Sequence, residues 1–116
     1  MLLPFNAEIF FYPKPIDFRK QMDSLIIMVN DVLSMNPTSG QIFIFRNKKS
    51  DRIKVLYWDR NGFWLLYRRL ESGKFIFPQQ SDIAMTLTLE QFQWLLSGLN
   101  LEDHKPIKAK EYKHFC

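Results

Sequence analysis

Cysteine and long apolar runs are the two features that this sequence most clearly lacks. Cys116 is the one cysteine among 116 residues, so no internal disulfide can form and nothing argues for an oxidising compartment. No apolar run approaches the roughly 20 residues of a membrane-spanning helix, and the first residues do not join a basic region to a long apolar stretch as secretory signals do. These absences lead us to expect a cytoplasmic protein with no membrane partner.

Motifs that carry catalysis are also missing. The sequence holds no nucleophile motif, no phosphate-binding glycine loop and no zinc-ligand spacing. Five carboxylates could in principle pair around a divalent cation, but each has a simpler role in a cap, a turn or an ion pair: Asp17, Asp23, Asp51, Asp59 and Glu71. Three further residues have side chains that can bind metals, but they lie in a predicted tail: His104, His114 and Cys116. We therefore predict no catalytic residue, no metal and no cofactor.

Aromatic side chains, in contrast, are abundant. The chain holds 11 Phe, four Tyr and three Trp, and 47% of its residues are hydrophobic. That is enough for one dense core in a chain of single-domain length. We predict that residues 1–100 form this domain and that residues 101–116, which contain four lysines, form a basic C-terminal tail.

Positive charge is concentrated in one segment. Residues 41–74 hold nine Lys or Arg and three Asp or Glu, a balance of +6, whereas the remaining residues hold seven and nine, a balance of −2. Aromatic residues are interleaved with these charges. Such a segment suits a phosphate backbone or an acidic protein surface. The alternative is a solvated edge whose charges discourage aggregation between strands.

Apolar patterning predicts a strand, a helix and then several strands. Strands are expected at residues 8–12, 41–46, 52–58 and 63–69, with a further short strand at 75–77. Asp17 has the position of an N-cap, and an apolar stripe at helical spacing follows it to about Ser34. The Asn61-Gly62 pair predicts a hairpin turn between two of the strands.

A second helix is predicted to start at Thr88. Its hydroxyl can cap the backbone of Gln91 while the Gln91 side chain reaches back, and Gly98 suits a C-terminal cap. This element order predicts an α+β fold in which an antiparallel meander of about four to five strands packs against two helices. The strands are apolar on both faces, so helices on one face would leave the other to the N-terminal strand, the tail or a partner protein.

Six blocks of the sequence, in order and at matching spacing, resemble a known family. They are PIDFRK (15–20), NPTSG (36–40), FIFRNKK (43–49), DRIKVLYWDRNGF (51–63), RLESGKFIFP (69–78) and LLSGL (95–99). Over residues 15–99 the chain is similar to the accessory proteins called TnpB of the insertion-sequence-66 family of bacterial mobile elements. Gln21 and Ser24 stand where that family usually has glycine, and both favour a regular helix because glycine lowers helix propensity by up to about 1 kcal/mol.

The resemblance implies a role in transposition beside a separate transposase, and it supplies no reaction. We predict weak, non-catalytic DNA binding, with the element termini as possible sites, through Arg19, Lys20, Arg46, Lys48, Lys49, Arg52, Lys54, Arg68 and Arg69. Arg19 and Lys20 are expected in the first turn of the first helix, where cations oppose the helix dipole. They would meet a phosphate or carboxylate there; the alternative is that they extend into water or pair with Asp17 or Asp23.

A protein–protein adaptor is the alternative hypothesis. In this interpretation the chain docks the transposase or another accessory protein of the element, without direct DNA contact, through an aromatic sheet face made by Tyr57, Trp58, Trp64 and Tyr67. A simpler role for Trp58 and Trp64 is a direct cross-strand pair that stabilises the hairpin.

Overall fold

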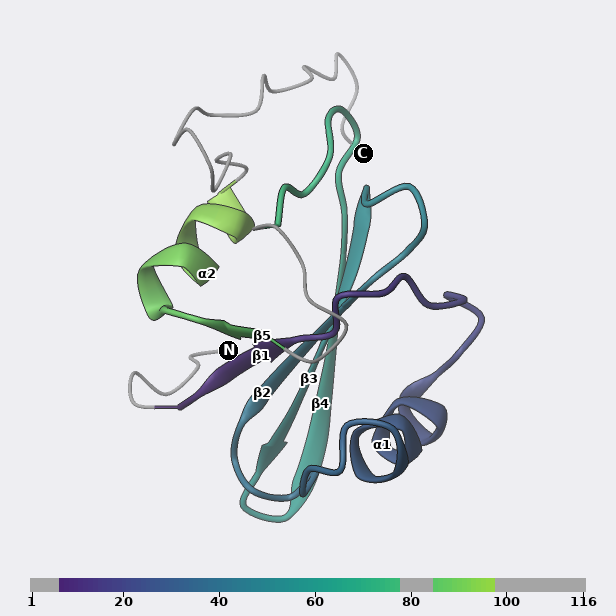
Figure 1. Cartoon of the computed structure of the whole chain (residues 1–116), viewed down its shortest axis with the longest axis vertical. Coiled ribbons are helices and arrows are strands. Elements are labelled where there is room, and N and C mark those ends of the chain that lie inside the picture. The colour runs from purple at the N-terminus through teal and green to yellow at the C-terminus, as the bar shows by residue number, and fades with distance from the viewer. Residues whose placement is uncertain (1–6, 78–84, 98–116) are drawn as a thin grey trace, which may run out of the picture.

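One five-stranded sheet with a helix on each face makes up the part of the chain that the structure describes (Figure 1). The structure is a computed structural model and describes residues 7–77 and 85–97. Its elements are β1 (Ile9–Phe11), α1 (Met22–Asp31), β2 (Ile42–Arg46), β3 (Arg52–Asp59), β4 (Gly62–Arg69), β5 (Met85–Leu87) and α2 (Leu89–Ser97). Within those two ranges no helix is long and apolar enough to cross a membrane. The predicted tail at 101–116 with its His and Cys residues, and the predicted cap at Gly98, lie outside the described residues.

The strand order is β4-β3-β2-β1-β5. β2, β3 and β4 form the predicted antiparallel meander, and β5 is antiparallel to β1. β1 instead pairs with β2 in parallel, with Ile9 beside Ile42 and Phe11 beside Ile44. The chain leaves β1, passes through α1 and returns to β2 in the same direction, which is the connection that parallel strands require. The α+β class is confirmed, and the prediction of an entirely antiparallel sheet is wrong for β1.

Each helix covers one face of the sheet. Leu25 and Val29 of α1 pack on the face that carries Phe43 and Leu56. On the other face, Phe92 and Leu95 of α2 join a cluster with strand residues such as Ile44 and Val55. Strands buried on both faces explain why β2 and the middle of β3 are apolar without alternation. The second apolar face is therefore covered by the second helix.

The segment 75–77 is not the predicted strand. Phe75 and Phe77 are buried in the cluster beneath α2, and the Phe77 ring lies 4.8 Å from the Phe11 ring, centroid to centroid. The place beside β1 is taken by β5, a strand of three residues that the sequence did not predict. The 75–77 segment thus contributes side chains to the core rather than backbone hydrogen bonds to the sheet.

The first helix begins at Met22, five residues after the predicted cap. The Asp17 carboxylate accepts a hydrogen bond from the Arg19 backbone N–H at 2.9 Å and so shapes a turn. A helix starting here would use the Phe18 carbonyl to accept the N–H of Met22, but that carbonyl accepts a hydrogen bond from the Lys54 ammonium instead. Gln21 precedes the helix as its N-cap residue. Of the two residues expected to favour a regular helix, Ser24 lies inside α1 and Gln21 does not.

The hairpin between β3 and β4 has Arg60 and Asn61 as its two loop residues, one position earlier than Asn61-Gly62. Arg60 takes the left-handed conformation, with φ of 56°. The resulting register sets Trp58 opposite Phe63 and Tyr57 opposite Trp64. A one-residue change of register moves side chains to the other face. The predicted pair of Trp58 and Trp64 is therefore wrong, and Trp58 packs edge-on against Phe63 with centroids 4.9 Å apart.

The predicted cap of the second helix is confirmed. The Gln91 backbone N–H donates to the Thr88 hydroxyl at 3.0 Å, and the Thr88 N–H donates to the Gln91 side-chain oxygen at 2.9 Å. This reciprocal pair satisfies two of the backbone donors that a helix N-terminus leaves without partners. It fixes where α2 begins and so how its apolar stripe meets the sheet.

Candidate nucleic-acid interface

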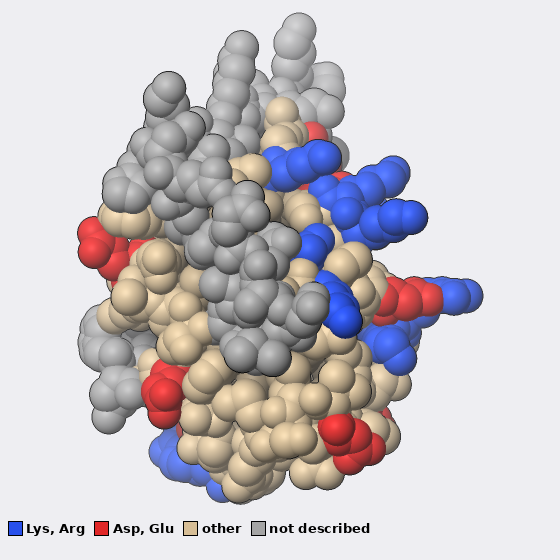
Figure 2. All heavy atoms as spheres, in the orientation of Figure 1, with Lys and Arg blue, Asp and Glu red and all other residues tan. Residues whose placement is uncertain are grey.

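Three strand ends bring cationic side chains to one end of the sheet. β2 ends at Arg46, β3 begins at Arg52 and β4 ends at Arg69, and the register sets Arg52 directly opposite Arg69. Figure 2 shows Lys and Arg gathered on this side of the molecule, while the surface near the β3–β4 turn carries few of them. We call this surface the basic end and define it by Arg19, Lys20, Lys48, Lys49, Arg52, Arg68, Arg69 and Lys74.

The connection between β2 and β3 is a tight, internally bonded turn. The Asn47 side-chain amide donates to the Asp51 carboxylate at 2.6 Å, and its oxygen accepts the Arg52 backbone N–H at 3.0 Å. The hydrogen bond from Asn47 lowers the pKa of Asp51. Ser50 has φ of 57°, in the left-handed region. Lys48 and Lys49, between Asn47 and Ser50, are exposed.

A hollow of about 310 Å³ lies beside this turn. Its lining combines an apolar part, a polar pair and three cations: Ile16, Phe18, Asn47, Asp51, Lys48, Lys49 and Arg52. The hollow joins the β2–β3 connection to the segment that precedes α1. The β2–β3 connection supplies the cations of this hollow, and the segment before α1 supplies its apolar residues.

Lys54 is not part of the surface, which corrects its assignment as a DNA-binding residue. Its side chain is 7% exposed, and its ammonium donates to the Phe18 carbonyl at 2.9 Å and the Lys20 carbonyl at 2.7 Å. The same ammonium lies 4.8 Å from the centroid of the Phe18 ring. Desolvation lowers the pKa of Lys54. Lys54 attaches the 18–20 segment to β3 and thereby positions Arg19 and Lys20.

Arg46 is also largely engaged within the fold. Its guanidinium donates to the Pro13 carbonyl at 2.6 Å and to the Ser50 hydroxyl at 3.2 Å. Burial lowers the pKa of the Arg46 guanidinium. The side chain braces the β2–β3 connection against the segment that follows β1. We therefore assign Arg46 a supporting role behind the exposed lysines.

Arg19 and Lys20 lie in the turn before α1, so their expected place in its first turn is wrong. The Arg19 guanidinium pairs with the Asp17 carboxylate at 2.5 Å, and its side chain is 91% exposed. Hydrogen bonds from the Arg19 side chain and backbone lower the pKa of Asp17 to about 2. Asp17 therefore offsets the charge of Arg19 at neutral pH, and Lys20 remains exposed beside the pair.

The two arginines that face each other across β3 and β4 differ in their surroundings. Arg69 forms an ion pair with Glu71 at 2.6 Å. The Arg52 Nε is buried and has no hydrogen-bond partner among the described residues. Like charges directly opposite each other on a sheet destabilise the pair. Arg68, one residue earlier on β4, is exposed on the other face.

Lys74 belongs to the basic end although the sequence did not single it out. The Leu70 N–H donates to the Asp51 carbonyl and the Phe75 N–H donates to the Ser50 carbonyl, both at 2.7 Å. These bonds hold the 70–75 segment against the β2–β3 connection, and Lys74, next to Phe75 in the sequence, is exposed there. Only the local charge balance could have indicated it, because the contact is set by backbone hydrogen bonds.

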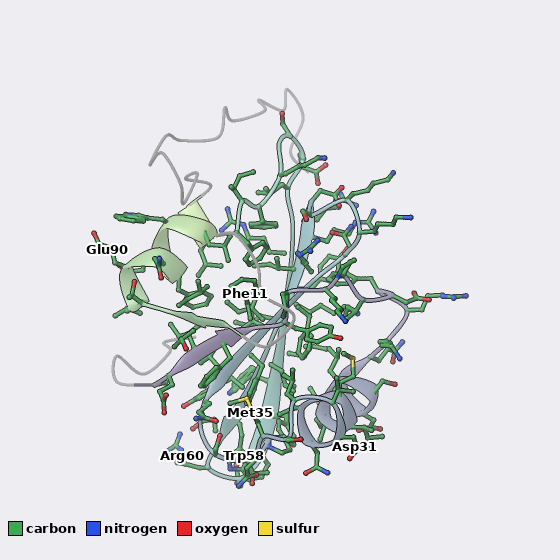
Figure 3. All side chains as sticks on the ribbon, in the orientation of Figure 1. Phe11, Asp31, Met35, Trp58, Arg60 and Glu90 are labelled. Atoms are coloured by element: carbon green, nitrogen blue, oxygen red, sulfur yellow. The ribbon has the colours of Figure 1, made fainter. Side chains whose placement is uncertain are left out.

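The four aromatic residues of the predicted partner site do not share one sheet face. Tyr57 and Trp64 are opposite each other, and the alternation of strand residues sets Trp58 and Tyr67 on the other face. Trp64 and Tyr67 are exposed, whereas Trp58 packs against Phe63 near the turn that bears Arg60 (Figure 3). One flat docking face made by all four is therefore wrong.

Four of the five candidate metal carboxylates are engaged in ordinary contacts, and the fifth, Asp23, is exposed in the first turn of α1. Asp17, Asp59 and Glu71 each pair with an arginine, and Asp51 accepts a hydrogen bond from Asn47. In the two described ranges no group of three or more His, Cys, Asp or Glu side chains is arranged to hold a metal ion.

Known relatives share most of the chain. The family model described as IS66 Orf2-like protein matches residues 7–106. An uncharacterised protein y4jC of Sinorhizobium fredii is 42% identical over 97 residues, which cover 82% of this chain and 83% of that protein. A second uncharacterised protein of the same organism, y4hO, is 32% identical over 95 residues, with the same two shares covered. No solved structure matches the chain significantly. The chain therefore belongs to the IS66 Orf2-like protein family.

Proposed function

We propose that this chain is a non-catalytic accessory protein of DNA transposition that acts beside a separate transposase and contacts the DNA backbone through its basic end. The family supports the link to an insertion sequence. The observation that carries the DNA contact is the convergence of Lys48, Lys49 and Arg52 around one hollow, with Arg68 at the adjacent strand end.

Phosphate contact suits the geometry of the basic end better than base recognition does. The exposed lysines project from a turn, and among the described residues no helix presents its side chains there for entry into a groove. Contacts of this kind fix a protein on the duplex and carry little sequence information. Arg52 and Arg69 are directly opposite each other, so an anion bound near them would also reduce the repulsion between their two positive charges.

The DNA contact is tested by fluorescence anisotropy of the purified protein with duplex DNA that carries the element's terminal inverted repeat. A scrambled duplex of equal length is the control, and both are titrated over a range of salt. Contact with about four phosphates predicts a slope of log K against log salt of about −3.6. Similar slopes for both duplexes support backbone contact, and no binding at low salt would refute the proposal.

The adaptor function is the second candidate, and the exposure of Trp64 and Tyr67 favours it. These side chains are 47% and 53% exposed on one strand, and aromatic residues of this kind are enriched at protein interfaces. Co-purification of the cognate transposase from a nuclease-treated lysate is the test. A complex that survives nuclease and is lost in a Trp64→Ala variant supports the adaptor, whereas a complex lost on nuclease treatment indicates DNA bridging.

A further inference from the structure

β4 is an edge strand that lacks most of the features that prevent edge strands of different molecules from pairing. It is terminal in the strand order, and within the described residues it pairs with β3 alone. Its eight residues pair with β3 in an unbroken register without a bulge, and they include no proline and no lysine. The other edge strand, β5, has only three residues. Natural edges are usually short, bulged or protected by Pro and Lys, so β4 is open to pairing with another strand.

The outward backbone groups of β4 can be assigned from one hydrogen bond at the end of the hairpin. The Leu70 N–H donates to the Asp51 carbonyl, and hydrogen-bonded pairs recur at every second position of an antiparallel ladder. Trp64, Leu66 and Arg68 therefore turn their N–H and C=O groups toward β3. The intervening residues Phe63, Leu65 and Tyr67 turn theirs outward and can form a ladder with an incoming strand.

The side chains along this edge are distributed unevenly. The first half of β4 is aromatic and apolar, with Phe63 and Trp64, and the last two residues are Arg68 and Arg69. Trp64 and Tyr67 are exposed on opposite faces of the same edge. A strand with the same distribution, aligned in the opposite direction, would set its cationic half beside the aromatic half of β4.

We propose that β4 pairs antiparallel with β4 of a second copy of this chain, so that two sheets join into one. A two-fold axis through Leu66 sets Trp64 opposite Arg68 of the second copy and Leu65 opposite Tyr67 of the second copy. Outward-facing residues then meet outward-facing residues, as a hydrogen-bonded ladder requires. The guanidinium of Arg68 can lie over the indole of Trp64, which is the aromatic side chain that attracts cations most strongly.

Repulsion between the Arg68 side chains of the two copies favours antiparallel over parallel pairing of the β4 strands. In this register the Arg68 side chains of the two copies are four residues apart along the strands, about 14 Å at about 3.4 Å per residue. That separation exceeds the Debye length of about 8 Å at physiological ionic strength, so their repulsion is weak. A parallel alignment in register would set the two arginines about 5 Å apart. The sequence of β4 is therefore complementary to itself in one direction only.

Sedimentation equilibrium of the full chain, freed of nucleic acid by nuclease and high salt, tests this pairing. We expect the wild type to have twice the 14.0 kDa mass of one chain. Trp64→Lys places a lysine opposite Arg68 of the second copy and should halve the mass. Adding Arg68→Glu to that variant should restore the dimer, because the introduced lysine then meets a glutamate. Ile27→Lys, at an apolar residue of α1 that is 57% exposed, is the matched control and should leave the mass unchanged.

Each outcome decides the proposal. A wild-type mass of one chain, a dimer that persists in Trp64→Lys, or a double variant that stays monomeric would overturn it. If Trp64→Lys fails to fold, Trp64→Glu is the second variant. Its glutamate would face Arg68 of the second copy, so this variant should still form the dimer. Capture of the transposase by β4 of a monomeric protein would also overturn it. DNA is absent throughout, so the result is independent of the proposed DNA contact.

Discussion

The Lys54 ammonium lies 4.8 Å from the centroid of the Phe18 ring and donates a hydrogen bond to the Phe18 carbonyl. Its second bond, to the Lys20 carbonyl, fixes the turn that carries Arg19 and Lys20. A buried cation in the sheet thus places exposed cations beside the β2–β3 connection. Lys54 therefore supports the basic end from inside the fold, while Arg19 and Lys20 extend from it into solvent.

Lys54→Met should destabilise the fold. The variant removes the donor of two carbonyls, and a buried acceptor left without its partner costs about 1–3 kcal/mol. Water can reach part of the 18–20 segment, so we expect a loss of about 2 kcal/mol in the free energy of unfolding, measured by urea denaturation. The control is Lys49→Met, at an exposed side chain, which should change stability by no more than about 0.5 kcal/mol. Equal effects of the two substitutions would refute the supporting role of Lys54.

Asp17→Asn should increase DNA affinity. The asparagine oxygen can still accept the Arg19 backbone N–H, so the turn is kept while the charge that offsets the Arg19 guanidinium is removed. One additional phosphate contact would make the slope of log K against log salt more negative by about 0.9. Anisotropy with a single duplex measures both quantities. Unchanged affinity would mean that Arg19 does not face the DNA.

The pKa of Asp17 gives the same ion pair a pH dependence. Hydrogen bonds from Arg19 lower this pKa from 3.8 to about 2. Because the folded-state pKa is the lower one, the ion pair stabilises the fold above pH 3.8, and this contribution is lost as the pH falls toward 2. Carboxyl-carbon NMR titration should find Asp17 near 2 in the wild type and closer to 3.8 in Arg19→Ala. An Asp17 that titrates near 3.8 in both proteins would contradict the pairing.

Thr88→Ala should weaken the start of α2. The substitution removes the hydroxyl that accepts the Gln91 N–H, and loss of such a cap costs about 1 kcal/mol. Thr88→Ser keeps the hydroxyl and should remain close to the wild type. Thermal unfolding followed by circular dichroism compares the three proteins, and equal midpoints for Ala and Ser would show that the cap contributes nothing.

Local rules predicted the parts of this fold that local contacts determine. The capping box at Thr88 and Gln91 was readable because both partners lie within one helical turn. The start of α1 was not, because it depends on Lys54, which is 36 residues from Phe18 in the sequence. The turn at Arg60 shifted the hairpin register by one residue, and this shift reassigned the partners of Trp58 and Trp64.

The candidate site, like the fold, was predictable only where it depends on residues close together in the sequence. Charge density along residues 41–74 indicated the cationic segment, and the structure brings Lys48, Lys49 and Arg52 around one hollow. Composition could not separate the exposed Lys49 from the buried Lys54, because burial depends on which strand residue faces the 18–20 segment. Lys74 joined the surface through backbone bonds of its neighbours that have no sequence signature.

The most direct test of the DNA contact compares two charge reversals at opposite ends of β3. Lys49→Glu alters the basic end, and Arg60→Glu alters the far turn, where Arg60 pairs with Asp59 at 3.1 Å (Figure 3). Both change the net charge equally, so nonspecific attraction to DNA changes equally. We predict that Lys49→Glu lowers affinity by at least about tenfold, or about 1.4 kcal/mol, and reduces the salt slope by about 0.9, while Arg60→Glu has a much smaller effect. Equal losses from the two variants would contradict a localised DNA contact at the basic end.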